Sequence, residues 1–227
     1  MKPKTLTAGG LTADVYLPKT ADVHSVSYAL TARRPSFSQL PELTAFHTAL
    51  VVITGMDWSR DLPPWDAPPL YRGDAPFQGG ADDFLSRLLT SVIPTIEKEY
   101  QLPKENPALI GVSLAGLFAA YAACRCDAFP RIASISGSLW YDGFTSFLTQ
   151  NPPVPAIRAA YFSLGRKEKK VKNARLAAVE TVTAQAAALF ESRGIRTTFE
   201  LNPGNHFTDG PLRLRKALAW LGEMADG

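Results

Sequence analysis

The sequence predicts an α/β fold in which a mostly parallel central sheet has helices on both faces. Short apolar runs such as ALVVIT (49–54) and ALIGV (108–112) are typical of strands buried on both sides of a parallel sheet. Segments of helical length alternate with these runs, as parallel connections require. The chain has 227 residues and no internal repeat or linker-like tract. We therefore expect one domain that spans residues 1–227.

Seven strands are predicted from apolar and β-branched runs that are bounded by turn residues. They are 12–17, 25–31, 49–54, 108–112, 132–136, 159–164 and 197–201.

Four helices are predicted between and after these strands, at 83–100, 113–124, 173–193 and 211–224. The first has an apolar stripe at helical spacing, and Pro94 is expected to kink it. Gly194 is placed to cap the third helix. The proline-rich segment 61–76 (DLPPWDAPPLYRGDAP) suits neither a helix nor a central strand. It is predicted to be a long ordered loop, and such loops are often functional.

Composition and charge exclude several classes of protein. Hydrophobic residues make up 46% of the chain and the net charge is only +3, which indicates a globular domain. No basic stripe interleaves with aromatic residues, so no nucleic-acid partner is expected. The basic run 166–172 is interpreted as a solvated loop, with a mild attraction for anionic substrates as the alternative. No apolar run approaches the roughly 18 residues of a membrane span. Lys2 and Lys4 precede the polar TLTAGGLT, so no secretory signal is expected.

The two cysteines predict a reducing compartment. Cys124 and Cys126 stand two positions apart on an expected helix, where they would point to different faces and could not easily form a disulfide. A cytoplasmic location is the simplest account. The CRC spacing and a total of three histidines predict no metal site, and no cofactor is expected.

The strongest chemical signal is ALIGVSLAGLFAAYAA (108–123), an apolar strand that turns directly into a helix. This is the context that a nucleophile elbow requires, with Ser113 as the nucleophile. Small residues are needed two positions before and two after the serine, and Gly111 and Ala115 fill these places. The amide of Leu114, at the helix N-terminus, is the expected oxyanion donor.

A serine hydroxyl needs a base, and His206 is the candidate. The α/β-hydrolase fold orders its catalytic residues as serine, acid and histidine along the chain, which excludes the upstream His24 and His47. His206 also follows the last predicted strand, in a loop rich in glycine, asparagine and proline.

The acid that orients the histidine is expected just after a strand between the two. Glu168 follows the strand 159–164 and is the first choice, with Asp142 as the alternative. A serine–histidine dyad without an acid stays open. The second oxyanion donor is expected after the strand 49–54, at or near the amide of Met56.

Four stretches together resemble the enterochelin- and salmochelin-esterase-like branch of the α/β-hydrolase esterases. They are GMDWSRDLPPWDAPP (55–69), GGADDFLSRLLTSVIPTIEKEY (79–100), IGVSLAGLFAAYAA (110–123) leading to SGSLWYDGF (136–144), and GNHFTDGPLRLRKALAWL (204–221). The family elements within them are matched by Arg60, Asp61, Pro63 or Pro64, Ser136, Ser138 and Trp140. The resemblance covers about residues 11 to 222.

This resemblance implies an intracellular or periplasmic carboxylic-ester hydrolase with Ser113 and His206 as its catalytic pair and Glu168 as its acid. The sequence departs from the family pattern at Val112, where a histidine is usual, and at Ala115, where a glycine is usual. The second strand also lacks the usual Asp-Gly ending. These departures leave ester hydrolysis as the expected reaction but weaken the expectation of a siderophore substrate.

The sequence thus predicts a serine esterase that acts on a small-molecule ester, with a catecholate trilactone as one substrate class. Trp58, Arg60 and Trp140 are the expected substrate-binding residues, and Trp65 and Tyr71 are further aromatic candidates for the pocket. The alternatives are a hydrolase of acetyl, feruloyl or thioester substrates with the same fold, and a binding module without turnover. The sequence does not specify an oligomeric state.

Overall fold

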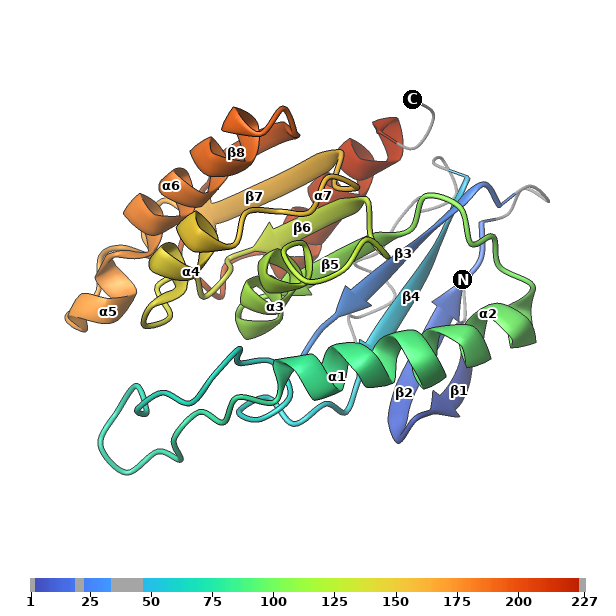
Figure 1. Ribbon diagram of the computed structural model, residues 1–227, viewed down its shortest axis with the longest axis horizontal. Helices are drawn as coiled ribbons and strands as arrows, with labels where there is room; N and C mark the ends of the chain where they lie inside the picture. The colour runs from blue at the N-terminus through green and yellow to red at the C-terminus, as the bar shows by residue number, and fades with distance from the viewer. Residues whose placement is uncertain (1–2, 19–22, 34–46, 225–227) are drawn as a thin grey trace.

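An eight-stranded sheet runs through the molecule (Figure 1). The computed structural model describes residues 3–18, 23–33 and 47–224. The strands are β1 (Lys4–Ala8), β2 (Leu11–Tyr16), β3 (Ser25–Leu30), β4 (Thr48–Thr54), β5 (Ala108–Val112), β6 (Arg131–Ile135), β7 (Ala159–Gly165) and β8 (Arg196–Asn202). Their order across the sheet is β1-β2-β4-β3-β5-β6-β7-β8.

The strands from β4 to the β8 edge all run parallel to one another. β1 and β2 form an antiparallel hairpin, and β2 pairs antiparallel with β4. Because β5, β6, β7 and β8 point the same way, the segments that follow them meet at one end of the sheet. Ligand sites of open α/β sheets are found at this carboxyl end.

The helices are α1 (Ala81–Arg87), the π-helix η3 (Leu88–Val92), α2 (Ile93–Tyr100), α3 (Leu114–Ala122), α4 (Phe144–Gln150), α5 (Ala174–Ala177), α6 (Val179–Ser192) and α7 (Gly210–Glu223). Helices α1, α3, α4 and α6 pack into one hydrophobic cluster, whereas α7 packs into a second cluster on the opposite face of the sheet. Figure 1 shows α7 behind the sheet, with α3 and α6 in front of it. The predicted α/β architecture with helices on both faces is confirmed.

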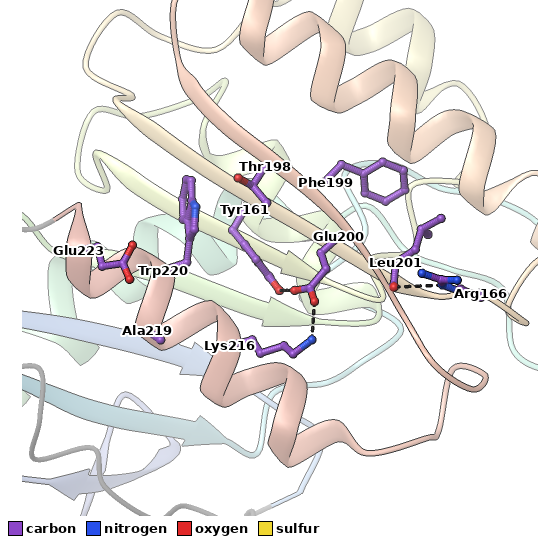
Figure 2. A pocket seen from close by; sticks show the side chains of 10 residues that line it. All are labelled: Tyr161, Arg166, Thr198, Phe199, Glu200, Leu201, Lys216, Ala219, Trp220 and Glu223. Carbon is purple, nitrogen blue, oxygen red and sulfur yellow. Dashed lines mark hydrogen bonds and ion pairs between the residues drawn. The ribbon is translucent and has the colours of Figure 1, made fainter.

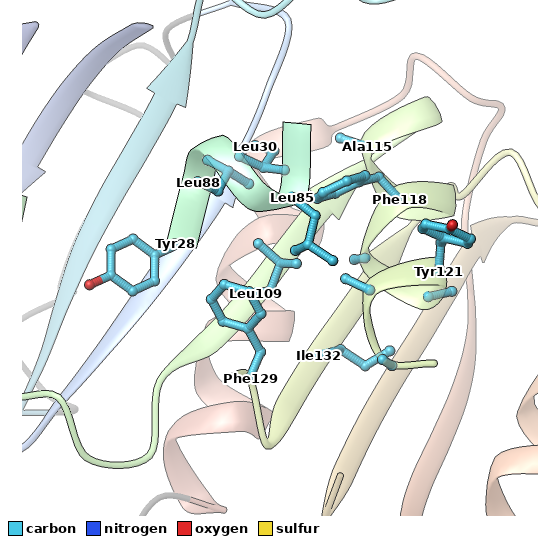
Figure 3. Close-up of a cluster of buried hydrophobic side chains, with 14 of the residues drawn as sticks. Tyr28, Leu30, Leu85, Leu88, Leu109, Ala115, Phe118, Tyr121, Phe129 and Ile132 are labelled. Carbon is cyan, nitrogen blue, oxygen red and sulfur yellow. The ribbon is translucent and has the colours of Figure 1, made fainter. Parts of the chain in front are cut away.

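The larger cluster joins the α1–η3 segment to α3 across the middle of the sheet (Figure 3). Leu109 of β5, Phe118 of α3 and Leu88 have no exposed surface, and the rings of Phe84 and Phe118 meet edge to face at 5.1 Å. Each fully buried side chain of this size contributes about 1.5–3 kcal/mol to folding. This packing fixes α3, and therefore the turn that precedes it.

All seven predicted strands are present, and their bounds agree within one residue at each end. The strand β1 was missed, although Gly9 and Gly10, both with positive φ, mark its hairpin turn. The C-terminal cap of α6 is confirmed, because Gly194 has φ 77° and its N–H donates to the carbonyl of Glu191.

Two helix predictions need correction, and one helix was missed. The segment 83–100 is divided into α1, η3 and α2, with Pro94 in the first turn of α2. A proline lacks the N–H for the α-helical ladder, and a π-helical turn accommodates this loss. The segment 173–193 divides at Ala178, and α4 was not predicted.

Cys124 and Cys126 also need correction, because they lie beyond the end of α3, in a turn and the loop after it, and not on the helix. Both are free thiols, and burial raises the pKa of Cys124 to about 12. Within the described ranges, no helix has both the length and the apolar composition needed to cross a membrane.

Candidate active site

Ser113 occupies a sharp turn between β5 and α3. Its backbone has φ 61° and ψ −123°, a conformation that costs a residue other than glycine about 1–3 kcal/mol. The Ser113 N–H donates to the carbonyl of Ile135 at 3.0 Å, and the Ser113 carbonyl accepts from the N–H of Ser138 at 3.0 Å. These hydrogen bonds to the neighbouring β6 segment hold the strained turn in place.

The small residues around Ser113 are required by space. A Cβ on Gly111 would lie 1.8 Å from the carbonyl oxygen of Ala115. A Cβ on Gly116 would lie 2.8 Å from the Cα of Gly137. Strand β5, helix α3 and the segment after β6 therefore approach one another more closely than any side chain there would permit.

The side chains of Ser113, His206 and Glu168 form one hydrogen-bonded chain. His206 lies in the loop between β8 and α7, with its Nε2 3.1 Å from Ser113 Oγ. Its Nδ1 is 2.9 Å from Glu168 Oε2. An ionised carboxylate only accepts hydrogen bonds, so the ring proton of His206 resides on Nδ1. Its Nε2 then accepts a hydrogen bond from the hydroxyl of Ser113.

The Glu168 carboxylate is buried and heavily hydrogen-bonded. Its Oε1 accepts from Ser136 Oγ at 2.8 Å, from Arg213 Nη1 at 3.0 Å and from the N–H of Gly165. Burial alone raises the pKa of Glu168, but the hydrogen bonds from His206, Gly165 and Ser136 outweigh it and hold the pKa below its ordinary value. The acid therefore stays ionised beside the histidine.

Arg213, which the sequence analysis did not identify, links the acid to the histidine loop. Its side chain is 2% exposed, and besides Glu168 it donates to the carbonyls of Pro203 and Asn205 at 3.2 and 2.8 Å. Both carbonyls lie within three residues of His206. The available signal was an arginine inside the apolar stripe of the last helix, seven residues after the histidine.

Gly165 leaves the space that this arrangement needs. A Cβ there would lie 2.6 Å from both Arg213 Nη2 and the carbonyl oxygen of Gly204. The N–H of Glu168 donates back to the Gly165 carbonyl at 2.9 Å, which closes a turn directly after β7. The spacing Gly-x-x-Glu thus brings the carboxylate back toward the end of the strand.

Two cavities meet at Ser113. The first, called here the apolar cavity, has a volume of about 360 Å³. Besides Ser113, His206 and Glu168, its walls include Leu70, Tyr71, Trp140, Leu176, Val179 and Phe207. The second cavity has a volume of about 430 Å³, and its walls include Trp58, Phe77, Leu114, Ser138 and Trp140. An ester bound at Ser113 could place its two halves in separate cavities.

The structure brings some of the predicted binding residues to these cavities and not others. Trp140 lines both cavities and Trp58 lines the second. Arg60 lines neither, and its Nε is 3.0 Å from Asp61. Met56 is buried and lines neither cavity, so the oxyanion role of its amide stays a prediction.

The remaining candidates have structural partners elsewhere. Trp65 packs against Phe144 and Phe147 of α4. Asp142, the alternative acid, is paired with Arg175 at 2.9 Å. The rings of His24 and His47 stack at 5.0 Å just before β3 and β4, at the opposite end of the sheet from Ser113.

A larger hollow lies away from Ser113, between the β7–β8 edge and α7 (Figure 2). It has a volume of about 740 Å³ and is shallow and open. Among its charged groups, Glu200 accepts hydrogen bonds from both Lys216 and Tyr161, and Arg166 donates to the carbonyl of Leu201. Neither the candidate nucleophile nor the candidate base lines this hollow, so the candidate active site is at the two cavities that Ser113 lines.

The parallel sheet and the strained serine between β5 and α3 define an α/β-hydrolase fold. The model of the family described as "Putative esterase" matches residues 25–209. The chain belongs to this family.

Among curated relatives, "Uncharacterized protein YbbA" of Bacillus subtilis (strain 168) is 29% identical over 137 residues, which are 59% of this chain. The match spans about half (53%) of the length of that relative.

Among solved structures, an IroE-like serine hydrolase from Shewanella oneidensis has a TM-score of 0.77 at 17% identity, covering 94% of this chain and 76% of that one. The enterobactin esterase FES from Shigella flexneri, crystallised in the presence of enterobactin, has a TM-score of 0.76 at 16% identity. That match covers 99% of this chain and 60% of FES. At these identities the likeness establishes the fold.

Proposed function

We propose that this protein is a serine carboxylic-ester hydrolase that works through an acyl-enzyme. The observation that carries the proposal is the unbroken hydrogen-bond chain from Ser113 through His206 to Glu168. Ser113, Glu168 and His206 follow β5, β7 and β8 at the carboxyl end of the sheet. Their order along the chain, serine, acid and histidine, is that of the α/β-hydrolase triad. Membership of an esterase family supports the same reaction class.

In the proposed first step, the Oγ of Ser113 attacks the ester carbonyl carbon while Nε2 of His206 takes its proton. The tetrahedral intermediate collapses as the bond to the leaving alcohol breaks, and His206 returns the proton to that alcohol. Water then attacks the acyl-enzyme with the same proton transfers and releases the carboxylic acid. Glu168 holds the Nδ1–H tautomer and stabilises the imidazolium throughout.

The oxyanion of the intermediate needs hydrogen-bond donors. Leu114 is the first residue of α3, so its N–H has no partner within the helix, and it lines the second cavity beside Ser113. The positive end of the α3 dipole adds to this stabilisation. The second donor is proposed to be the amide of Met56 or of a close neighbour in the loop after β4.

The substrate is proposed to be a small-molecule ester, and no cofactor enters the mechanism. The names of the structural neighbours make a siderophore ester of the catecholate trilactone type one candidate. Acetyl, feruloyl and thioester substrates are the alternatives within the same chemistry.

A fluorophosphonate probe tests the proposal. We expect stoichiometric labelling of the wild-type protein at Ser113 and none in Ser113→Ala, while Ser146→Ala, which alters an exposed serine on α4, labels like the wild type. On short p-nitrophenyl esters, Ser113→Ala and His206→Ala should each lower kcat by about three powers of ten or more.

A wild-type protein that is folded but never labelled would reject the proposal in favour of a binding module without turnover. Labelling at a serine other than Ser113 would move the active site elsewhere.

A further inference from the structure

The walls of the two cavities carry more information about the substrate than the reaction class does. Resting on the proposed function, we infer that the site selects esters with a long, uncharged apolar acyl or aryl group. This group fills the apolar cavity and continues across its rim. Anionic substrates such as ferric catecholates are disfavoured by the same walls.

The first observation concerns exposed apolar side chains. Among the residues that the structure describes, the large hydrophobic side chains with high exposure are Tyr71 (57%), Val171 (44%) and Phe207 (90%). All three line the apolar cavity, although they come from separate loops. We call them the apolar rim. Exposed apolar groups that gather at one place usually mark a binding surface.

The apolar cavity continues this surface toward Ser113. Besides the apolar rim and the hydrogen-bonded chain of Ser113, His206 and Glu168, its walls are formed by Leu70, Leu176, Val179, Trp140, Ser136 and Ser138. A volume of about 360 Å³ exceeds the needs of an acetyl group and suits a medium-length chain or an aromatic ring. Each methylene buried there contributes about 0.8 kcal/mol.

The second observation concerns charge. Among the described residues that line either cavity, none is a lysine or an arginine. The acidic residues there are Glu168, which serves His206, and Asp74 of the second cavity. A carboxylate or catecholate that entered would lose water without gaining a cationic partner, which is costly.

The cation behind Trp140 does not change this balance. Arg175 lies 5.4 Å from the ring centre of Trp140, but its guanidinium is paired with Asp142 and donates to the carbonyls of Pro68 and Pro69. It is therefore committed to the loop, and it is absent from the walls of both cavities.

A matched pair of substrates tests the inference. p-Nitrophenyl octanoate and the mono-p-nitrophenyl ester of octanedioic acid differ only in whether the chain ends in a methyl group or a carboxylate. We expect kcat/KM to be about tenfold or more higher for the octanoate. Equal values, or a preference for the carboxylate, would overturn the inference.

Variants of the apolar rim localise the effect. Phe207→Ser and Val171→Ser should each raise KM for the octanoate roughly three- to tenfold, with a smaller change for the acetate. The conservative variants Phe207→Leu and Val171→Leu should retain the wild-type KM. If the serine variants leave the octanoate KM unchanged, the apolar rim does not contact the acyl chain and the inference fails.

Two further measurements distinguish this inference from the esterase proposal and from binding to a membrane. Binding of the octanoyl and octanedioyl 4-nitroanilides to Ser113→Ala, followed by tryptophan fluorescence, needs no turnover. If Ser113→Ala prefers the octanoyl compound but the fluorophosphonate does not label the wild-type protein, the apolar site is supported and the esterase proposal is rejected.

Neutral phosphatidylcholine vesicles test whether the apolar rim binds a lipid surface instead. Co-sedimentation that Phe207→Ser abolishes, without any change in octanoate KM, would assign the apolar rim to membranes and overturn the inference.

Discussion

The carboxylate of Glu168 accepts four hydrogen bonds, from Ser136, Gly165, Arg213 and His206. Each of its two oxygens serves a different purpose. Oε2 meets the imidazole, whereas Oε1 is held by the protein framework. Because three donors fix Oε1, the other oxygen has little freedom to turn away from His206. The orientation of the histidine is thus set by hydrogen bonds between Glu168 and the protein framework.

Arg213 is the framework residue whose loss should be felt most. Arg213→Met leaves a buried carboxylate without its cation, and we expect a loss of about 3–5 kcal/mol in the free energy of unfolding. We also expect kcat to fall by about a hundredfold, because the His206 loop loses two of its carbonyl contacts.

Urea denaturation and kcat on a short ester measure these two effects. Arg215→Met removes an exposed arginine two residues away on α7 and serves as the control. An Arg213→Met protein with wild-type kcat would contradict a positioning role.

At the scale of single residues, the sequence was enough to propose the three members of the hydrogen-bonded chain, but not the residues that support them. Ser113 was identifiable because an elbow is a local pattern of strand, small residues and helix. His206 and Glu168 followed from chain order and from their places after strands. Arg213 was not identifiable, because its partners are a side chain 45 positions away and two loop carbonyls that only the fold brings to it.

At the scale of elements, the proline-rich loop 61–76 is ordered by its carbonyl groups. Prolines have no N–H, so this loop has few backbone donors besides the bridge between Ala67 and Phe77, and several of its carbonyls accept from outside donors. Arg175 supplies donors to Pro68 and Pro69, and the amide of Asn173 donates to Leu70 at 3.2 Å. The start of α5 therefore anchors a wall of both cavities.

Removing this anchor should expose the loop to protease. In Arg175→Ala we expect trypsin to cleave after Arg72, an exposed residue of the loop, at least several times faster than in the wild type. Timed digestion followed by mass spectrometry measures the rate. Arg193→Ala, an exposed arginine after α6, is the matched control. An unchanged rate at Arg72 would indicate that other contacts hold the loop.

Elements were predictable where the signal is local. The buried strands are continuous apolar runs, and their bounds were right to within one residue. The π-helical turn of η3 was not predictable, because a shift of the hydrogen-bond ladder leaves the apolar stripe nearly unchanged. Helix α4 is short, and its buried Phe144 and Leu148 depend on tertiary contacts for their role.

At the scale of the whole molecule, stability should depend on pH through Glu168. Its folded pKa lies below the ordinary 4.5, so it stabilises the fold above that pH, and this contribution is lost as the pH falls through the folded pKa. The stability difference between wild type and Glu168→Gln should therefore shrink as the pH falls from about 5 through the folded pKa of Glu168.

Urea titrations across this range measure that difference. Glu99→Gln, at an exposed position of α2, provides the reference. A difference that stays constant down to the lowest pH would show that Glu168 does not contribute through its charge.

The core that positions α3 should account for a large part of the stability. Phe118 is fully buried, and Phe118→Ala should lower the free energy of unfolding by about 3–5 kcal/mol. Phe207 is 90% exposed, and Phe207→Ala should change the free energy of unfolding by no more than about 0.5 kcal/mol. The urea midpoint should shift in the first variant with an unchanged slope, and a small shift would contradict the packing described here.

The position of α7 after every strand has a consequence for biosynthesis. A growing chain could assemble the sheet and its serine turn while still attached to the ribosome, since domains form as their amino-terminal parts emerge. His206 and Arg213 arrive only afterwards. The hydrogen-bond chain from Ser113 to Glu168 can therefore close only after the segment that carries His206 and Arg213 has docked on the sheet.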